Sequence, residues 1–190
     1  MPSLIGVDEA GRGALAGPVV AAAVCLPEGL SCELFADSKQ LTASKRDEAY
    51  AYLIENRVPM GVGIVNHIVI DRINILRATL LAMKRAVASL GDVGVLDVLV
   101  DGNRAPDLPG YRVETLVKGD QLNSVVSAAS IVAKVTRDRI MTRLDCAFPE
   151  YGFASHKGYG TVVHYNSIEQ FGLSKIHRVT FYHGIQARLF

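Results

Sequence analysis

The sequence predicts an α/β fold, and three observations support this prediction. Short apolar runs typical of strands begin the chain, helical patterns then alternate with further runs, and no internal repeat interrupts the order. The 190 residues are 49% hydrophobic, which suits one domain with a substantial core rather than a disordered chain. We therefore expect a single domain over residues 1–190.

The expected strands are short runs of β-branched and apolar residues that end at turn residues. We place them at 4–8, 19–25, 60–65, 95–100 and 111–117. A glycine-rich turn joins the first two, which suits a hairpin-like return of the chain. The strand at 95–100 is followed directly by Asp101 and Gly102.

The expected helices follow from apolar periodicity and end signals. After a polar loop at 37–42, Thr42 or Ser44 can cap a helix that runs to about Asn56. The clearest helix spans 73–90, because its apolar residues recur at intervals of three and four and Gly91 follows them. An alanine-rich helix is expected over 124–144, a loop over 153–159, and two last helices over 161–171 and 180–189.

Composition excludes several classes of protein. No apolar run approaches the roughly 20 residues of a membrane helix, and the first residues lack the pattern of a signal peptide. The cysteines are Cys25, Cys32 and Cys146, an odd number without CxxC spacing, which argues against a disulfide framework or a zinc site. We therefore expect a cytoplasmic protein. The net charge of +1 is compatible with nucleic-acid binding if some acidic residues cluster, but does not argue for it.

Acidic residues stand where predicted strands end. Asp8 and Glu9 follow one apolar run and Asp101 ends another. Adjacent strand residues point to opposite faces, so Asp8 and Glu9 can share one site only if the strand ends there and bends, which Gly11 and Gly13 permit. Each of these acids alone is explained better as a turn cap.

Two further acids compete for a place in such a site. Asp120 precedes the helix expected from residue 124, where an acid is also favoured by the helix dipole. Asp138 lies inside that helix between Arg137 and Arg139, and a solvated charge cluster explains it better. Several carboxylates with no Cys or His cluster favour a hard cation, Mg²⁺ or Mn²⁺, over zinc.

The glycine-rich segment 11–16 formally matches the GxGxxA pattern of dinucleotide-binding proteins. That pattern should open a helix, whereas here Pro18 and a β-branched strand follow within a few residues. We interpret the segment instead as a backbone loop held close to a nucleic acid, with Arg12 supplying charge.

The ordered set of motifs resembles bacterial ribonuclease HII and covers nearly the whole chain. The matching blocks are GVDEAGRG at 6–13 with Gly17 and Pro18, DSK at 37–39, DGN at 101–103, KGD at 118–120, SAASIVAK at 127–134, HKGYGT at 156–161 and IHR at 176–178. The first and the HKGYGT block are each quite specific, and together they are very hard to obtain by chance.

The resemblance implies a ribonuclease H-like fold, with a mixed sheet of about five strands, flanking helices and a helical C-terminal part from about residue 145. It implies a catalytic, metal-binding set of Asp8, Glu9, Asp101 and Asp120. It also implies substrate contacts at Gly11, Arg12, Gly13, Ser38, Lys39, Lys157, Tyr159, His177 and Arg178. Tyr159 would pack on a sugar near the cleavage junction, whereas any of the basic residues could also be a solvated surface charge.

The resemblance further implies the reaction. We expect a monomeric hydrolase that cuts RNA/DNA hybrids and cuts beside ribonucleotides in duplex DNA, leaving 5′-phosphate and 3′-hydroxyl ends. A nicotinamide enzyme and a catalytically inactive hybrid-binding module are the alternatives. The first lacks the helix after Gly13, and the second gives no reason to keep four costly carboxylates.

Overall fold

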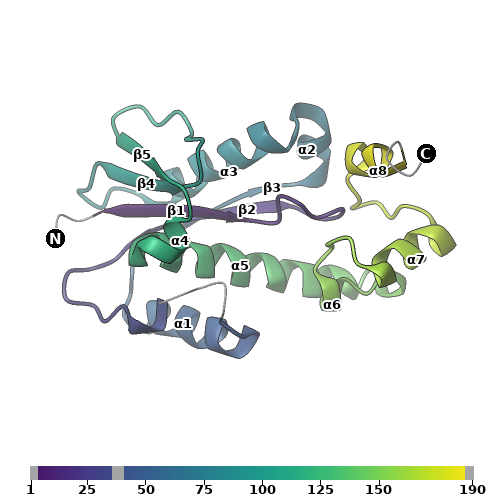
Figure 1. Cartoon of the computed structure of the whole chain (residues 1–190). Coiled ribbons are helices and arrows are strands. Elements are labelled where there is room, and N and C mark those ends of the chain that lie inside the picture. The colour runs from purple at the N-terminus through teal and green to yellow at the C-terminus, as the bar shows by residue number, and fades with distance from the viewer. Residues whose placement is uncertain (1–3, 36–40, 187–190) are drawn as a thin grey trace.

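A mixed five-stranded sheet forms the centre of the computed structural model, which describes residues 4–35 and 41–186 (Figure 1). The strand order is β3-β2-β1-β4-β5; β1, β2 and β3 pair antiparallel, whereas β1, β4 and β5 run parallel. The strands are β1 Ile5–Ala10, β2 Val19–Cys25, β3 Met60–Val65, β4 Asp97–Asp101 and β5 Arg112–Leu116. The predicted α/β class with about five mixed strands is confirmed.

Helices cover both faces of the sheet, and a helical part lies at one end (Figure 1). α2 and α3 lie on one face, while α1, α4 and α5 lie on the other. The helices are α1 Ala43–Glu55, α2 His67–Ile73, α3 Ile75–Leu90, α4 Gly119–Leu122, α5 Ser124–Asp145, α6 Phe153–His156, α7 Val162–Phe171 and α8 Val179–Gln186, with 3₁₀ turns at Glu33–Phe35 and Pro149–Tyr151. None of the helices among the described residues is long and apolar enough to cross a bilayer.

Side-chain alternation along the central strands divides the core into two layers. Ile5 and Val7 of β1 pack in the cluster under α3, whereas Ala10 packs in the cluster under α5. α5 approaches β1 closely, because a Cβ atom on Gly6 would lie 2.4 Å from the backbone carbonyl carbon of Val125. This close packing places the start of α5 beside the residues that follow Val7.

A third apolar cluster attaches the C-terminal helices to the sheet. It joins Leu15 and Ala16, which follow β1, to Met141 at the end of α5 and to residues 151–176 of the C-terminal part. The predicted helical C-terminal part after about residue 145 is therefore packed against the loop that leaves β1. This arrangement brings three segments that are distant in sequence to one end of the sheet.

The structure departs from the predicted elements in a few places. The helix expected over 73–90 corresponds to α3, which begins at Ile75, while Ile73 ends a separate helix, α2, that was not predicted. Asn74 between them has a φ of 67° and caps α3 by accepting the N–H of Arg77 at 3.1 Å. The apolar stripe continues across this break, so periodicity alone did not reveal it. The loop expected over 153–159 contains the short helix α6, and the last predicted helix begins at Val179.

Candidate active site

Two acidic residues lie side by side on neighbouring parallel strands. In the pairing of β1 with β4, Val7 stands opposite Val100, so the next residues, Asp8 and Asp101, are adjacent across the sheet. Val7 and Val100 point into the α3 layer, and alternation therefore directs Asp8 and Asp101 towards α5. Sheet register thus brings together two carboxylates that are far apart in sequence.

Asp101 also holds the turn that carries the next acid. Its Oδ1 accepts the backbone N–H of Gly119 at 2.7 Å, which fixes the start of α4 against the end of β4. Lys118, just before, takes a left-handed conformation with a φ of 60°. Asp120 follows Gly119 and is only 1% exposed. One hydrogen bond therefore ties the position of Asp120 to that of Asp101.

Glu9 reaches this region from the opposite face of β1. The expectation that the strand ends near Asp8 was wrong, because β1 continues through Glu9 to Ala10 in unbroken pairing with β2. The Glu9 carboxylate forms an ion pair with Arg12 at 3.1 Å. It still interacts electrostatically with Asp8 and Asp101. Both faces of β1 therefore contribute acids to the cluster without a bend in the strand.

The electrostatics of the cluster disfavour negative charge. Burial raises the pKa of Asp8 well above its usual value, and repulsion from Glu9 and Asp101 adds to the effect. Burial also raises the pKa of Glu9, although Arg12 opposes this shift. A hydrogen bond from Ser130 favours the charged form of Asp8. A cation bound between these groups would relieve both the burial cost and the repulsion.

The donor chemistry fits a hard divalent cation, since carboxylate oxygens are the ligands that Mg²⁺ and Mn²⁺ prefer. Within the described part of the chain, no three His, Cys, Asp or Glu side chains are arranged closely enough to hold an ion in common. The side chains would therefore have to adjust on binding. The repulsion that Glu9 and Asp101 exert on a charged Asp8 favours such an adjustment around a cation.

A cleft of about 380 Å³ lies beside the acids. It joins Glu9 and the glycine loop, which we define as residues 11–17, to α1, α5 and the loop of Tyr159. Its lining residues are Glu9, Ala10, Gly11, Arg12, Gly13, Arg46, Ser130, Ile131, Lys134 and Tyr159. Sequence reasoning did not single out Arg46 or Ser130, although Ser130 lies within the matching block at 127–134.

The glycine loop is packed tightly at Gly11 and open at Gly13. Gly11 has a φ of 93°, and a Cβ atom there would lie 2.0 Å from Nε of Arg137. A Cβ atom on Gly13 would meet nothing within 4 Å. The loop leads into β2 rather than into a helix, which removes the structural basis of the dinucleotide-binding interpretation.

Two buried arginines hold the glycine loop from beneath. Arg178 donates to the carbonyl oxygens of Gly11 at 2.7 Å, Arg12 at 2.9 Å and Gly17 at 3.0 Å. Arg137 donates to the carbonyl oxygens of Pro18 at 2.9 Å, Lys157 at 2.9 Å and Ala16 at 3.2 Å. Both side chains are fully buried, so each guanidinium group acts as an internal brace between loops.

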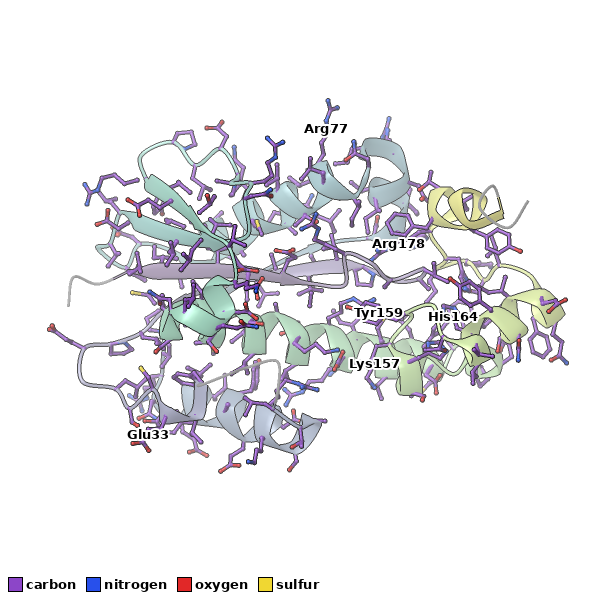
Figure 2. The ribbon with its side chains drawn as sticks, viewed as in Figure 1. Glu33, Arg77, Lys157, Tyr159, His164 and Arg178 are labelled. Atoms are coloured by element: carbon purple, nitrogen blue, oxygen red, sulfur yellow. The ribbon has the colours of Figure 1, made fainter. Side chains whose placement is uncertain are left out.

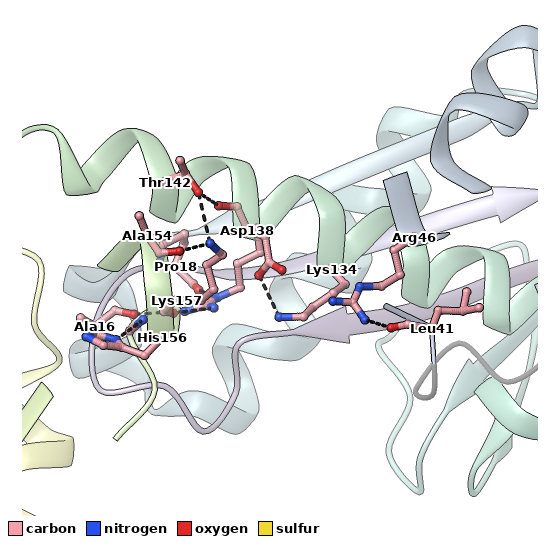
Figure 3. Close-up of polar contacts among 12 residues, drawn as sticks. Ala16, Pro18, Leu41, Arg46, Lys134, Asp138, Thr142, Ala154, His156 and Lys157 are labelled. Atoms are coloured by element: carbon pink, nitrogen blue, oxygen red, sulfur yellow. Dashed lines mark hydrogen bonds and ion pairs between the residues drawn. The ribbon is translucent and has the colours of Figure 1, made fainter. Parts of the chain in front are cut away.

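The burial of Arg137 was missed by sequence reasoning, which grouped it with Asp138 and Arg139 as solvated charges. Its position contained a signal, because it lies four residues after Ala133 and four before Met141, on the buried side of α5. Asp138 does behave as expected for a surface residue. It forms an ion pair with Lys134 at 2.8 Å along the helix (Figure 3).

The other expected substrate contacts differ in accessibility. Tyr159 lines the cleft, with Arg137 Cζ 5.2 Å and Lys134 Nζ 5.8 Å from its ring centroid. Lys157 Nζ bonds to the carbonyl of Ala154 and lies 3.3 Å from Thr142 Oγ1 (Figure 3). The Arg12 side chain is 53% exposed.

Four of the expected contacts do not lie on the described surface. His177 is 2% exposed and Arg178 is 0% exposed, so neither side chain is free to meet a phosphate from solvent. Figure 2 shows Arg178 where the loops from the sheet meet the C-terminal part. Ser38 and Lys39 fall outside the described residues.

Comparison with known proteins places the chain in a family. The sequence model described as Ribonuclease HII matches residues 5–183. The chain belongs to the ribonuclease HII family. It is 54% identical to the ribonuclease HII of Geotalea daltonii over 94% of this chain and 82% of that protein. The predicted resemblance is confirmed, and ribonuclease HII membership makes the chain a ribonuclease H enzyme, an endonuclease that acts on nucleic acid.

Solved structures related to ribonuclease HII share this architecture. The ribonuclease H2 of Pyrococcus horikoshii aligns with a TM-score of 0.72 and 28% identity, covering 98% of both chains. Bst-RNase HIII in complex with Mn²⁺ aligns with a TM-score of 0.75 over 94% of this chain and 67% of that one. The latter is 23% identical and concerns the fold alone.

Proposed function

We propose that the chain hydrolyses the RNA strand of RNA/DNA hybrids and cuts on the 5′ side of a single ribonucleotide embedded in duplex DNA. The products carry 5′-phosphate and 3′-hydroxyl ends, and the active form is a monomer. The observation that carries the proposal is the shared cleft, in which Glu9, beside Asp8 and Asp101 at the edge of the sheet, faces both the glycine loop and Tyr159. Carboxylates for phosphodiester chemistry and groups suited to a sugar therefore lie together.

In this proposal Asp8, Glu9, Asp101 and Asp120 hold Mg²⁺ or Mn²⁺. The bound metal supplies an activated water and stabilises the charge that develops on phosphate. The chain itself supplies the arrangement: the register of β1 with β4 aligns Asp8 and Asp101, and the Gly119 hydrogen bond positions Asp120. Burial and repulsion make the charged form of Asp8 costly, which raises its pKa. A bound cation would offset this cost.

Recognition of the ribonucleotide is assigned to the glycine loop. The 2′-hydroxyl distinguishes RNA from DNA because it both donates and accepts hydrogen bonds. The carbonyl oxygens of Gly11 and Arg12 already accept bonds from Arg178, which holds that side of the turn inward. The open space at Gly13 suits close approach of a sugar to the backbone.

The remaining predicted contacts take two roles. Tyr159 packs on the neighbouring sugar, while Arg12, Ser38, Lys39 and Lys157 contact phosphates, which positions the duplex without reading bases. The burial of His177 and Arg178 supports a different role, in which they position the loops that meet the substrate.

The test is cleavage of end-labelled duplexes that carry no ribonucleotide, one or four, with and without a chelator. We expect cutting 5′ of the single ribonucleotide, no cutting of the all-DNA duplex, and loss of activity with chelator. Asp101→Asn should abolish cleavage. Asp138 pairs with Lys134 along α5, so Asp138→Asn should cut at close to the normal rate. Cleavage of only the four-ribonucleotide duplex would refute single-ribonucleotide recognition, and binding without cleavage would favour the inactive-module alternative.

A further inference from the structure

Two buried histidines lie behind Tyr159 and have no part in the proposed chemistry. His164 of α7 is 0% exposed, His177 before α8 is 2% exposed, and their Nε2 atoms are 2.9 Å apart. Aromatic rings enclose them: the Phe153 centroid is 5.5 Å from that of His164, and the Tyr151 centroid is 5.0 Å from that of His177. Burying two polar rings in such surroundings is costly unless their hydrogen bonds are made.

Their hydrogen bonds form a chain with one possible direction. A neutral imidazole has one donor and one acceptor nitrogen. Nδ1 of His177 accepts the backbone N–H of Ser174 at 2.8 Å, so the proton of His177 sits on Nε2 and is donated to Nε2 of His164. His164 then carries its proton on Nδ1, which donates to the carbonyl oxygen of Tyr159 at 2.9 Å.

The chain ends on the peptide group that orients Tyr159. The same carbonyl accepts the N–H of Thr161 at 2.9 Å, and the Tyr159 N–H donates to the backbone carbonyl oxygen of His156 at 3.0 Å. The preceding carbonyl, of Gly158, accepts the N–H of Leu15 at 2.8 Å. Tyr159 is therefore fixed on one side by His164 and joined on the other to the glycine loop.

The segment of His177 is joined to the same loop. Its neighbour Arg178 donates its backbone N–H to Leu15 at 2.8 Å, and Gly17 donates to Ile176 at 2.9 Å. Ala16 and His177 form an antiparallel bridge. Hydrogen bonds thus connect the glycine loop, the His177 segment and Tyr159 to one another. These bonds set the separation between the glycine loop and Tyr159, the two groups that would contact adjacent nucleotides. Figure 2 shows Tyr159 and His164 at this end of the molecule.

We propose that His164 and His177 are positioning residues that hold Tyr159 at a fixed separation from the glycine loop and thereby set discrimination at the ribonucleotide junction. The proposal rests on the proposed role of Tyr159 at that junction. It assigns the two histidines to substrate selection rather than to cleavage, since neither touches the cleft.

The electrostatic surroundings keep both rings neutral, as the chain requires. Burial lowers the pKa of His164 and of His177 to about 4, and His164 also disfavours charge on His177. The other titratable groups that act on the pair are His156 of α6 and His67 of α2, which also disfavour its protonation. A proton added to His177 would place an N–H on Nδ1, directly facing the Ser174 N–H that it now accepts.

Two near-isosteric variants of His164 separate the ends of the chain. In His164→Asn the side-chain amide lies where Nδ1 was and can still donate to Tyr159, whereas in His164→Gln it lies nearer the position of Nε2 and keeps only the contact with His177. The measured quantity is the cleavage rate of the one-ribonucleotide duplex divided by that of the four-ribonucleotide duplex. His164→Gln should lower this ratio on the order of tenfold, because small displacements of a positioning group are costly, and His164→Asn should retain most of it.

A control and a second background complete the experiment. Phe153→Leu disturbs the packing around both histidines but leaves the hydrogen-bond chain, so it should lower thermal stability without changing the ratio. In a Tyr159→Ala background, which should lower the ratio by itself, His164→Gln should have no further effect. If Tyr159→Ala leaves the ratio unchanged, the proposed role of Tyr159 fails. If Tyr159→Ala lowers it but His164→Gln does not, the positioning inference alone is overturned.

Discussion

Replacing Arg137 by Met tests whether a buried guanidinium braces the loops of the site. Met keeps an unbranched apolar chain but removes the donors to the carbonyl oxygens of Pro18, Lys157 and Ala16. These acceptors belong to the segment after β1 and to the loop of Tyr159. Their loss therefore loosens contacts between two segments that line one cleft.

The magnitude follows from those three hydrogen bonds. A hydrogen bond with a charged partner contributes about 1.5–3 kcal/mol, so the gross loss is several kcal/mol. Part of it is offset, because burial lowers the pKa of Arg137 and removing the guanidinium ends that burial cost. A net loss of about 3 kcal/mol, at roughly 2–4 °C per kcal/mol for a protein of this size, lowers the Tm by about 6–12 °C.

Thermal unfolding followed by circular dichroism measures the effect, with Arg139→Met as the matched control. Arg139 lies on the same helix, but its side chain is 52% exposed and its ion pair with Asp47 contributes at most about 1 kcal/mol. Arg137→Lys should be nearly as unstable as Arg137→Met, since an ammonium group cannot reach three carbonyls at once. Equal Tm values for Arg137→Met and Arg139→Met, or full stability of Arg137→Lys, would refute the bracing argument.

Three other predictions concern charge. Arg12→Ala should weaken hybrid binding and reduce the slope of log K against log salt by about 0.7–0.9 in an anisotropy titration, and an unchanged slope would remove Arg12 from the phosphate contacts. Asp101→Asn should raise the Tm in chelator by relieving repulsion on Asp8, and a lower Tm would contradict this reasoning. Because the pKa values of His164 and His177 fall from 6.5 to about 4 on folding, the unfolded chain takes up these protons first as the pH drops below 6.5. Urea unfolding at pH 4.5 should thus show a loss of about 2 kcal/mol per histidine relative to pH 7. The raised pKa of Asp8 acts in the opposite direction, because it adds stability as the pH falls. The effect of the histidines is therefore measured against a His164→Asn, His177→Gln variant, which should lose less stability at pH 4.5 than the unsubstituted protein.

Local pattern accounts for much of the fold. The apolar runs at 4–8 and 19–25 became β1 and β2, and the alanine-rich segment from Ser124 became α5. Each prediction rests on a property of neighbouring residues, namely side-chain period, capping and turn residues. The break at Asn74 was missed for the same reason, because Ile73 before the break fits the apolar spacing of α3.

The candidate site divides in a similar way. The sequence placed Asp8 and Asp101 at the ends of strands, but only the parallel pairing of β1 with β4 made them neighbours. Glu9 illustrates the opposite outcome: a bend was expected, whereas the strand stays regular and Glu9 reaches the cluster from the other face.

By itself the sequence determined the fold class, the order of the elements and the residue types available for chemistry, because these depend on short-range periodicity and composition. Only the tertiary structure decided which polar groups are internal. Four polar residues of types that are common at protein surfaces are buried here, namely Arg137, His164, His177 and Arg178. Each donates hydrogen bonds to backbone carbonyl oxygens or to another ring. Burial of such groups is favourable only where distant loops bring carbonyl oxygens to the donors, and that convergence is a property of long-range packing.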